Sequence, residues 1–194
     1  MAFPIKNYAQ KIKDIHRPER IWVICHPFSV LKAWKISKEA RLIANSHIND
    51  PDFDGDYNGG QVDAFRHTLW MAMLTQKTSA RAAEKLGIAH EKGNKIDYDK
   101  KLLEEGKLPD SVACEMDLRN NKVGINIGKK YKKTPSDELQ KIVKQAVLDG
   151  ECWIINKDTN GQFLDENDKL IPEEKYIGKW ITPKVLVPSN KIRK

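Results

Sequence analysis

The sequence predicts a mainly α-helical protein of about five helices with a small β-hairpin appendage at its C-terminal end. Two observations support this prediction. Apolar residues recur every three or four positions up to about Gly150, which is the spacing of amphipathic helices. After Gly150 the chain changes to short apolar runs between turn residues, a pattern typical of short strands. We therefore expect a helical domain at residues 1–150, with a hairpin and extended strap packed on it at residues 151–194.

Composition limits the class of protein. The 194 residues are enough for one domain with a substantial core. The net charge of +7 favours anionic partners, although a solvated basic face explains lysine runs such as 129–133 equally well. The three cysteines are widely spaced, so we expect small buried side chains rather than a disulfide framework. No apolar run is long enough to span a membrane, and the amino terminus lacks a signal-peptide pattern.

The first three predicted helices lie in the N-terminal half. The second carries an apolar stripe that includes Val62, Phe65 and Leu69. Ser79 is a suitable cap for the third, and Gly93 lies just past its expected end. A charged and irregular surface segment is expected to follow at residues 95–109. The three helices are expected at residues 27–48, 62–76 and 79–91.

Two further helices are predicted at residues 111–130 and 134–149. In the tail, Asn160-Gly161 is a strong hairpin-turn signal between the apolar runs 152–155 and 162–164. The run at 185–187 follows a proline and is expected to form an edge strand or an extended strap.

An acidic loop lies between the first two helices. Aspartates alternate with other residues and Gly55 follows the third, as in a calcium loop. The twelfth position is Gln61 rather than glutamate, so a calcium site here would differ from a standard EF-hand and would use Asp63. A polar turn that binds no ion is the alternative. The expected ligands of Ca²⁺ or a similar divalent cation are Asp50, Asp52, Asp54, Asp56, Asn58 and Asp63.

Polar side chains also interrupt the apolar helix faces. Asp63 and His67 are four residues apart and share a face, where an aspartate can orient a histidine and raise its basicity. His90 and Glu91 are adjacent near the end of the third predicted helix. Such groups are costly to bury without partners. We therefore expect the helices to bring them together in one site.

The fourth predicted helix carries a polar stripe formed by Asp117, Asn120 and Asn121. Gly124 and Gly128 on the same helix would let a neighbouring helix or a ligand approach closely. A structural explanation is also open for these groups, because the asparagines can bond to the backbone and Asp117 can form an ion pair.

The histidines have alternatives of their own. His67 alone could be a hydrogen-bonded core residue, and His90 could simply favour a helix C-terminus. A zinc site formed by His67, His90 and a carboxylate is a weaker possibility, since no HExxH spacing exists.

Three sequence blocks carry a family resemblance: DAFRHTLW at 63–70, AHE at 89–91 and MDLRNNKVG at 116–124. They resemble a bacterial family with the pattern DAFRHxxW…AHE…MDLxNNxxG. That family is a domain of unknown function at the ends of secreted, wall-associated and polymorphic-toxin-like proteins. The resemblance covers residues 58–128. It implies a shared site formed by Asp63, Arg66, His67, His90, Glu91, Asp117, Asn120 and Asn121.

The leading hypothesis is a metal-assisted hydrolase of phosphate esters in the bacterial envelope, with an antibacterial toxin or effector as one form of it. His67, tuned by Asp63, would act as general base, and His90 or Glu91 as acid or second base. Asp117 completes the expected catalytic set. Arg66 would hold the anionic group, and the asparagine pair Asn120-Asn121 would orient it.

The substrate would be a phospholipid, a lipid-linked wall precursor or nucleic acid. Calcium favours an extracytoplasmic or secreted location, and a toxin would have a cognate immunity protein as partner. The first alternative is a non-catalytic calcium-stabilised module that binds envelope polymer or a partner protein. The second is a nuclease, which the basic charge favours and the lack of aromatics among the lysine runs disfavours.

Overall fold

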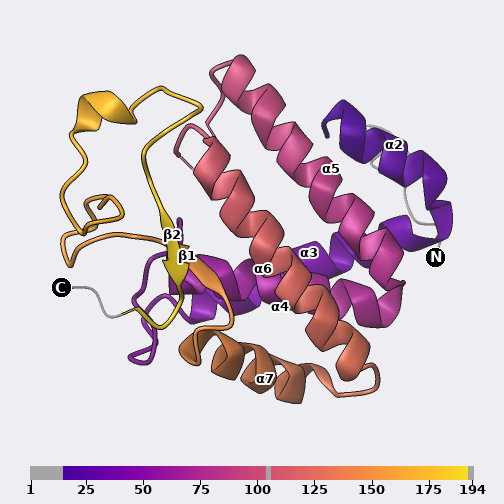
Figure 1. Ribbon diagram of the computed structural model, residues 1–194. Coiled ribbons are helices and arrows are strands. Elements are labelled where there is room, and N and C mark those ends of the chain that lie inside the picture. Colours follow the sequence, from indigo (N-terminus) through magenta and orange to yellow (C-terminus); the bar gives the residue numbers. More distant parts are fainter. Residues whose placement is uncertain (1–14, 104–105, 192–194) are drawn as a thin grey trace.

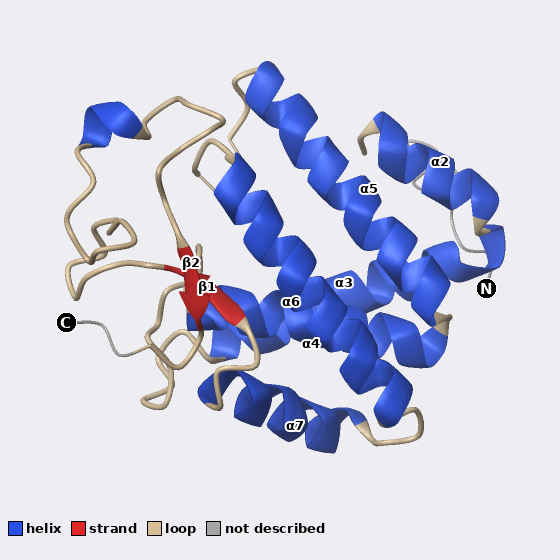
Figure 2. Cartoon of the chain, viewed as in Figure 1, coloured by secondary structure: helices blue, strands red, loops and turns tan. Residues whose placement is uncertain are grey.

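Helices form most of the fold in the computed structural model, which describes residues 15–103 and 106–191 (Figures 1 and 2). None of the described helices is both long and apolar enough to cross a membrane. The described helices are α2 (Arg17–Cys25), α3 (Val30–Ser46), α4 (Gln61–Lys77), α5 (Ala80–Asp99), α6 (Ser111–Lys130) and α7 (Ser136–Leu148), with short 3₁₀ turns η1 (Pro27–Ser29) and η2 (Glu173–Lys175). The strands are β1 (Trp153–Ile155) and β2 (Leu186–Pro188).

Helix α4 lies at the centre of the fold, in contact with α3, α5, α6 and α7. Its side chains Phe65, Leu69, Met71 and Leu74 are completely buried. A helix buried on nearly every side, including at the polar residues Asp63 and His67, is stable only where other elements surround it. Full burial of each of these side chains contributes roughly 1.5–3 kcal/mol, so α4 is the main contributor to the core.

Two glycines of α6 allow it to pack closely on α4. A Cβ atom at Gly124 would lie 2.2 Å from the carbonyl oxygen of Thr68, and one at Gly128 would lie 2.6 Å from that of Ala72. No side chain fits at such distances. The close neighbour that the sequence predicted for these glycines is therefore helix α4.

Helix α5 differs from its prediction. Its N-terminus is capped as expected by Ser79, whose Oγ accepts a hydrogen bond from the backbone N–H of Ala82 at 3.1 Å. The expected end near Glu91 is wrong, because the helix continues to Asp99. Gly93 lies inside the helix, where a Cβ atom would be 2.8 Å from the imidazole of His16. This glycine admits a neighbouring segment and does not end the helix.

The segment at residues 95–109 is therefore helical in its first part, while residues 104–105 lie outside the described residues. Helix α2 was not predicted. It has nine residues, of which only Trp22 is buried, so it lacks a clear apolar stripe. The Trp22 indole N–H donates a hydrogen bond to the carbonyl of Ala82 at 2.8 Å, which holds α2 against α5.

The small β element is present, but its strands pair differently from the prediction. Strand β1 pairs antiparallel with β2, so that Ile155 faces Leu186. The turn at Asn160-Gly161 does form, with only an isolated bridge between Lys157 and Phe163. The partner of β1 is therefore the run that was expected to be an edge strand or strap, and the long loop 156–185 connects the two strands (Figure 2).

Candidate functional site

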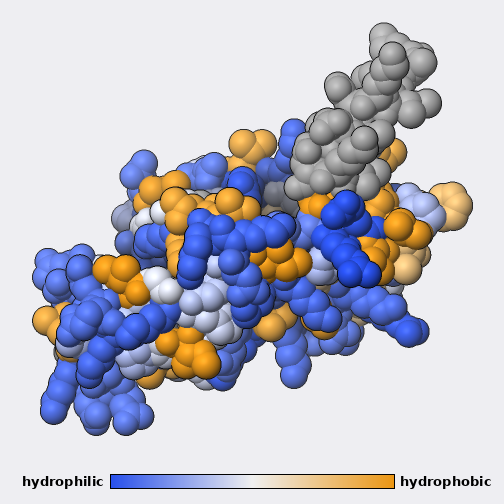
Figure 3. Space-filling model, turned by 90° about the horizontal axis from the view of Figure 1, so that it is seen from above, coloured by the Kyte–Doolittle hydropathy of each residue, from blue (hydrophilic) through white to orange (hydrophobic). Residues whose placement is uncertain are grey.

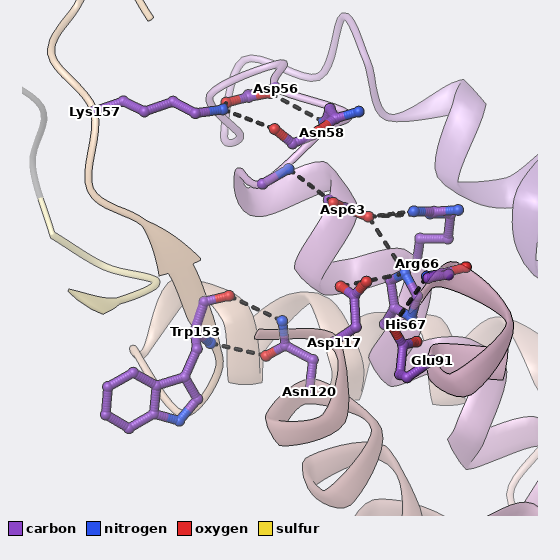
Figure 4. Close-up of polar contacts among 12 residues, drawn as sticks. Asp56, Asn58, Asp63, Arg66, His67, Glu91, Asp117, Asn120, Trp153 and Lys157 are labelled. Carbon is purple, nitrogen blue, oxygen red and sulfur yellow. Dashed lines mark hydrogen bonds and ion pairs between the residues drawn. The ribbon is translucent and has the colours of Figure 1, made fainter. Parts of the chain in front are cut away.

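Asp63 and His67 on α4 meet Asp117 on α6 at the centre of the site (Figure 4). The Nε2 atom of His67 lies 3.5 Å from Oδ1 of Asp63 and 3.4 Å from Oδ1 of Asp117. One ligand atom from each residue lies within 4.8 Å of the other two, and all three side chains are buried. The structure thus brings together three residues that the sequence assigned to one site. We refer to them as the central cluster.

The central cluster has the geometry of a cation site. The two distances from His67 Nε2 to the carboxylate oxygens are longer than good hydrogen bonds, so the three side chains lie together without a close contact. Burial holds the pKa of His67 well below its usual value, and the positive charges of Arg66 and His90 act in the same direction. A neutral imidazole can offer a nitrogen lone pair to a cation held between it and the two carboxylates. Ligands at about 2.1 Å from a tetrahedral metal lie about 3.4 Å apart, so a divalent cation would fit.

Further contacts fix the carboxylate of Asp63. Its Oδ2 accepts a hydrogen bond from the backbone N–H of Gly59 at 2.7 Å, and its Oδ1 accepts one from Nε of Arg66 at 3.2 Å. The Arg66 guanidinium also lies over the ring of Tyr57, 5.0 Å from its centroid. Supporting contacts of this kind orient a metal ligand and set its basicity.

A cleft of about 280 Å³ opens beside the central cluster. Asp63 and Asp117 line it from the helices, together with Arg66. The loop between β1 and β2 closes it from the other side and provides the aromatic rings of Phe163 and Tyr176. Lys107 and Lys179 also line the cleft and bring positive charge to it, whereas the ammonium group of Lys184 is paired with the carboxylate of Asp110 at 2.6 Å.

A second hollow of about 190 Å³ lies on the other side of His67. It is lined by His67 and His90, with Arg41 and Arg66 contributing positive charge. His90 is directed to Glu19 of α2, whose Oε1 lies 3.2 Å from its Nδ1. The zinc arrangement that would join His67 and His90 through a shared carboxylate is therefore not what the structure forms.

The remaining predicted residues have mixed roles. Both polar atoms of the Asn120 side chain are hydrogen-bonded to β1 (Figure 4). Its Oδ1 accepts the backbone N–H of Trp153 at 2.8 Å, and its Nδ2 donates to the carbonyl of the same residue at 2.9 Å. Asn120 therefore holds β1 against α6, and its amide is not directed into the cleft. Glu91 is buried and accepts a hydrogen bond from Asn94 at 3.0 Å. Asn121 is buried, and its side chain interacts with that of His67.

The carboxylates of the acidic loop do not point toward one shared position. Lys144 approaches Asp50 at 2.7 Å and Asp52 at 2.8 Å. Lys157 lies 2.6 Å from Asp56 and donates to the carbonyl of Asn58 at 2.7 Å.

Asp54 accepts the backbone N–H of Gln61 at 3.0 Å, and Asp63 places one carboxylate oxygen on the backbone N–H of Gly59 and the other near His67. Within residues 15–103 and 106–191, the central cluster is the one group of three acidic, histidine or cysteine side chains with metal-site spacing. The structure thus does not assemble the predicted calcium ligands, because lysine ammonium groups and backbone N–H groups engage the loop carboxylates.

The sequence did not identify the basic residues of the cleft. Lys107, Lys179 and Lys184 lie outside the motifs, and only their charge distinguishes them. Arg41 of the second hollow was missed for the same reason. The folding of the tail over the helices brings Lys179 and Lys184 to the cleft, whereas Lys107 reaches it from the loop between α5 and α6.

Comparison with known proteins gives one match, to a protein-family model. A family model described as a domain of unknown function (DUF6973) matches residues 20–151, more than half of the chain. The matched range contains helices α3 to α7 and the whole central cluster, and it ends just before β1. The searches of curated proteins and of solved structures found no match.

Proposed function

The chain belongs to the DUF6973 family, and we propose that it is a divalent-metal-dependent hydrolase of phosphate esters. The central cluster supports this proposal: two carboxylates and a neutral imidazole, buried and close together, beside a cleft that Arg66, Lys107 and Lys179 also line. Each feature has a use in phosphate-ester hydrolysis, which needs a cation at the reacting phosphorus and positive charge around the phosphate oxygens.

The donor set indicates which metal to expect. An imidazole with two carboxylates suits borderline cations such as Zn²⁺ or Mn²⁺. Calcium prefers about six to eight oxygen ligands, so it is the weaker candidate within the same proposal. Three protein ligands would leave positions for water and for a substrate oxygen.

The bound metal would supply a water of lowered pKa and neutralise charge on the phosphate. In the overall reaction the water oxygen bonds to phosphorus and the ester P–O bond breaks. One water proton passes to the leaving oxygen. In this proposal His67 is a metal ligand rather than the general base, because its Nε2 faces both carboxylates. Arg66 holds Asp63 in place, and Lys107 and Lys179 would bind the phosphate oxygens.

The proposed substrate is a phosphate ester of the bacterial envelope, either a phospholipid or a lipid-linked wall precursor. The aromatic rings of Phe163 and Tyr176 would contact its apolar portion. A cleft of about 280 Å³ does not admit a nucleic-acid duplex, which makes a nuclease the less favoured form. Action outside the cytoplasm as a toxin or effector, neutralised by an immunity protein, belongs to the same proposal and comes from the family resemblance.

One observation favours a non-catalytic alternative. His67 is only 2% exposed, and a metal held so deeply could serve to lock α4 onto α6. In that case the protein would be a metal-stabilised binding module. Both forms require a metal at the central cluster, and hydrolysis distinguishes them.

Metal binding is tested first, by calorimetric titration of the chelator-treated protein with Zn²⁺, Mn²⁺, Mg²⁺ and Ca²⁺. We expect one site per chain and a loss of affinity on the order of a hundredfold in Asp117→Asn. The matched control is Glu115→Gln, an exposed acidic residue of the same helix, which should bind as the wild type does. Wild-type protein that binds none of these cations would contradict both forms of the proposal.

Hydrolysis is then measured on the metal-loaded protein with nitrophenyl phosphate mono- and diesters and a short-chain phosphatidylglycerol. We expect activity in the wild type and in Glu115→Gln, and a loss on the order of a hundredfold or more in Asp117→Asn and His67→Ala. Circular dichroism confirms that the variants are folded. Metal binding without hydrolysis of any of these substrates would support the binding module and contradict the hydrolase.

A further inference from the structure

The corner where α2 turns through η1 into α3 exposes an unusual set of apolar side chains. Ile21 and Ile24 lie on one face of α2, Phe28 lies in η1, and Leu31 lies in the first turn of α3. Phe28 is 93% exposed and Ile24 is 76% exposed. We call these four residues the corner patch. Neighbouring large apolar side chains this exposed mark a binding surface more often than isolated ones do.

The corner patch is surrounded by positive charge. Between Ile15 and Lys38 the chain has five basic residues and one acidic residue, Glu19. The basic residues Arg17, Arg20, Lys32, Lys35 and Lys38 are all exposed. The Glu19 carboxylate is directed to His90, so the five basic residues leave a net positive charge around the patch.

The patch lies on the side of the molecule opposite β1, β2 and the C-terminal tail (Figure 1). Figure 3, seen from above, shows apolar side chains reaching the surface at this right-hand end among hydrophilic ones. A groove of about 510 Å³ between α2 and α5 continues the surface, with Lys85 and Lys92 along it. The positive charge therefore extends beyond the corner itself.

Hollows inside the corner also suit an amphiphile. Trp22, Trp34 and Leu86 line an apolar hollow of about 140 Å³. This hollow adjoins the second hollow beside His67, because Glu19, Ser37 and Trp70 line both. An acyl chain that entered at the corner would thus have an apolar space behind it and positive charge further in.

We propose that the corner patch docks the protein onto an anionic lipid bilayer. Phe28 and Ile24 insert among the acyl chains, and the surrounding arginines and lysines contact the lipid phosphates. This combination of an apolar wedge and flexible basic side chains is typical of interfacial membrane elements. Protein–protein interfaces, in contrast, are depleted in lysine. Docking does not depend on hydrolysis, so it can be tested separately from the proposed activity.

The test is flotation of the full chain with vesicles of phosphatidylcholine alone, or with phosphatidylcholine and phosphatidylglycerol in a ratio of about three to one. We expect the wild type to bind the anionic vesicles, to leave them at high salt and to ignore the neutral ones. The double variant Ile24→Ser with Phe28→Ser should lose binding by roughly tenfold or more. Lys32→Ala and Lys35→Ala should each lower it roughly fivefold.

Ile181→Ser is the matched control, because Ile181 is 79% exposed but lies in the tail. It should bind anionic vesicles as the wild type does. Wild-type protein that does not bind anionic vesicles would overturn the proposal, as would equal binding by the double variant. Light scattering after gel filtration tests whether a second copy of the chain covers the corner patch instead. If the wild type is a dimer and the double variant is a monomer, the patch is a dimer interface, and the bilayer proposal is overturned.

Discussion

At the scale of single residues, the acidic loop shows how one spacing can serve two structures. Each of Asp50, Asp54 and Asp56 accepts a hydrogen bond from the backbone N–H two residues further on, at 2.9–3.1 Å. Repeated turns of this kind require aspartate at alternate positions, just as a calcium loop does. The sequence could not separate the two because the lysines that neutralise the loop, Lys144 and Lys157, lie far along the chain.

The cysteines allow a prediction at the same scale. All three were expected to be buried, but Cys25 is exposed and only Cys114 and Cys152 are buried. Burial raises the pKa of Cys152 to about 12, so its thiol stays protonated at neutral pH. Because the thiolate is the reactive form, we expect one fast-reacting thiol in the native protein, measured with a chromogenic disulfide reagent at pH 8.

The variant Cys25→Ser should remove that fast reaction, and denaturant should release the other two thiols. A second native thiol that reacts as fast as Cys25 would show that Cys114 or Cys152 is accessible, contrary to the structure.

At the scale of helices, the pairing of α4 with α6 forms the candidate site. The spacing of Asp63 and His67 was readable from the sequence, because residues four apart share a helix face. Asp117 lies near Asp63 and His67 only because α6 packs closely on α4. Gly124 and Gly128 of α6 allow this close contact. Periodicity predicted α6 at its observed bounds, but it missed α2, which has too few buried residues to show a stripe.

Gly124→Ala tests this helix contact. In an open helix, alanine in place of glycine stabilises by roughly 1 kcal/mol. Here the new Cβ atom would lie 2.2 Å from the Thr68 carbonyl oxygen, so we expect a loss of about 2 kcal/mol or more in the free energy of unfolding. Urea denaturation followed by circular dichroism measures it.

The control is Asn126→Ala, which is exposed on the same helix and should change stability by about 0.5 kcal/mol at most. A Gly124→Ala protein more stable than the wild type would mean that α4 and α6 are not in close contact at this point.

At the scale of the whole molecule, contacts between distant segments determine the partner of β1 and the lining of the cleft, which the sequence did not predict. The apolar run of β1 was recognised, but its partner β2 follows a long irregular loop, and no local pattern specifies that pairing. The same loop brings Phe163, Tyr176 and Lys184 to the cleft. Local periodicity therefore predicted the mainly helical class and the cluster residues on α4 and α6, whereas the cleft depends on tertiary packing.

The ion pair of Asp50 with Lys144 joins the acidic loop to α7 and predicts a pH dependence. The hydrogen bond from Lys144 holds the pKa of Asp50 well below its usual value. A carboxyl group with a lowered folded-state pKa stabilises the fold above its unfolded pKa of about 3.9, and this stabilisation is lost as the pH falls further. The free energy of unfolding should therefore fall less steeply below about pH 4 in Asp50→Asn than in the wild type.

The effect should stay within about 1 kcal/mol, because the pair lies near the surface. Thermal melts across the acid range measure it, with Asp137→Asn, an exposed residue of α7, as control. Parallel stability curves for the wild type and Asp50→Asn would exclude the pair as a source of acid sensitivity.

The cleft has one wall inside the range matched by the family model and the other outside it. Asp63 and Asp117 lie within residues 20–151, whereas Phe163, Tyr176 and Lys184 come after it. A protein that kept the helices and exchanged the segment beyond β1 would keep the central cluster and line the cleft with different side chains. The two walls of the cleft could therefore change independently of each other in evolution.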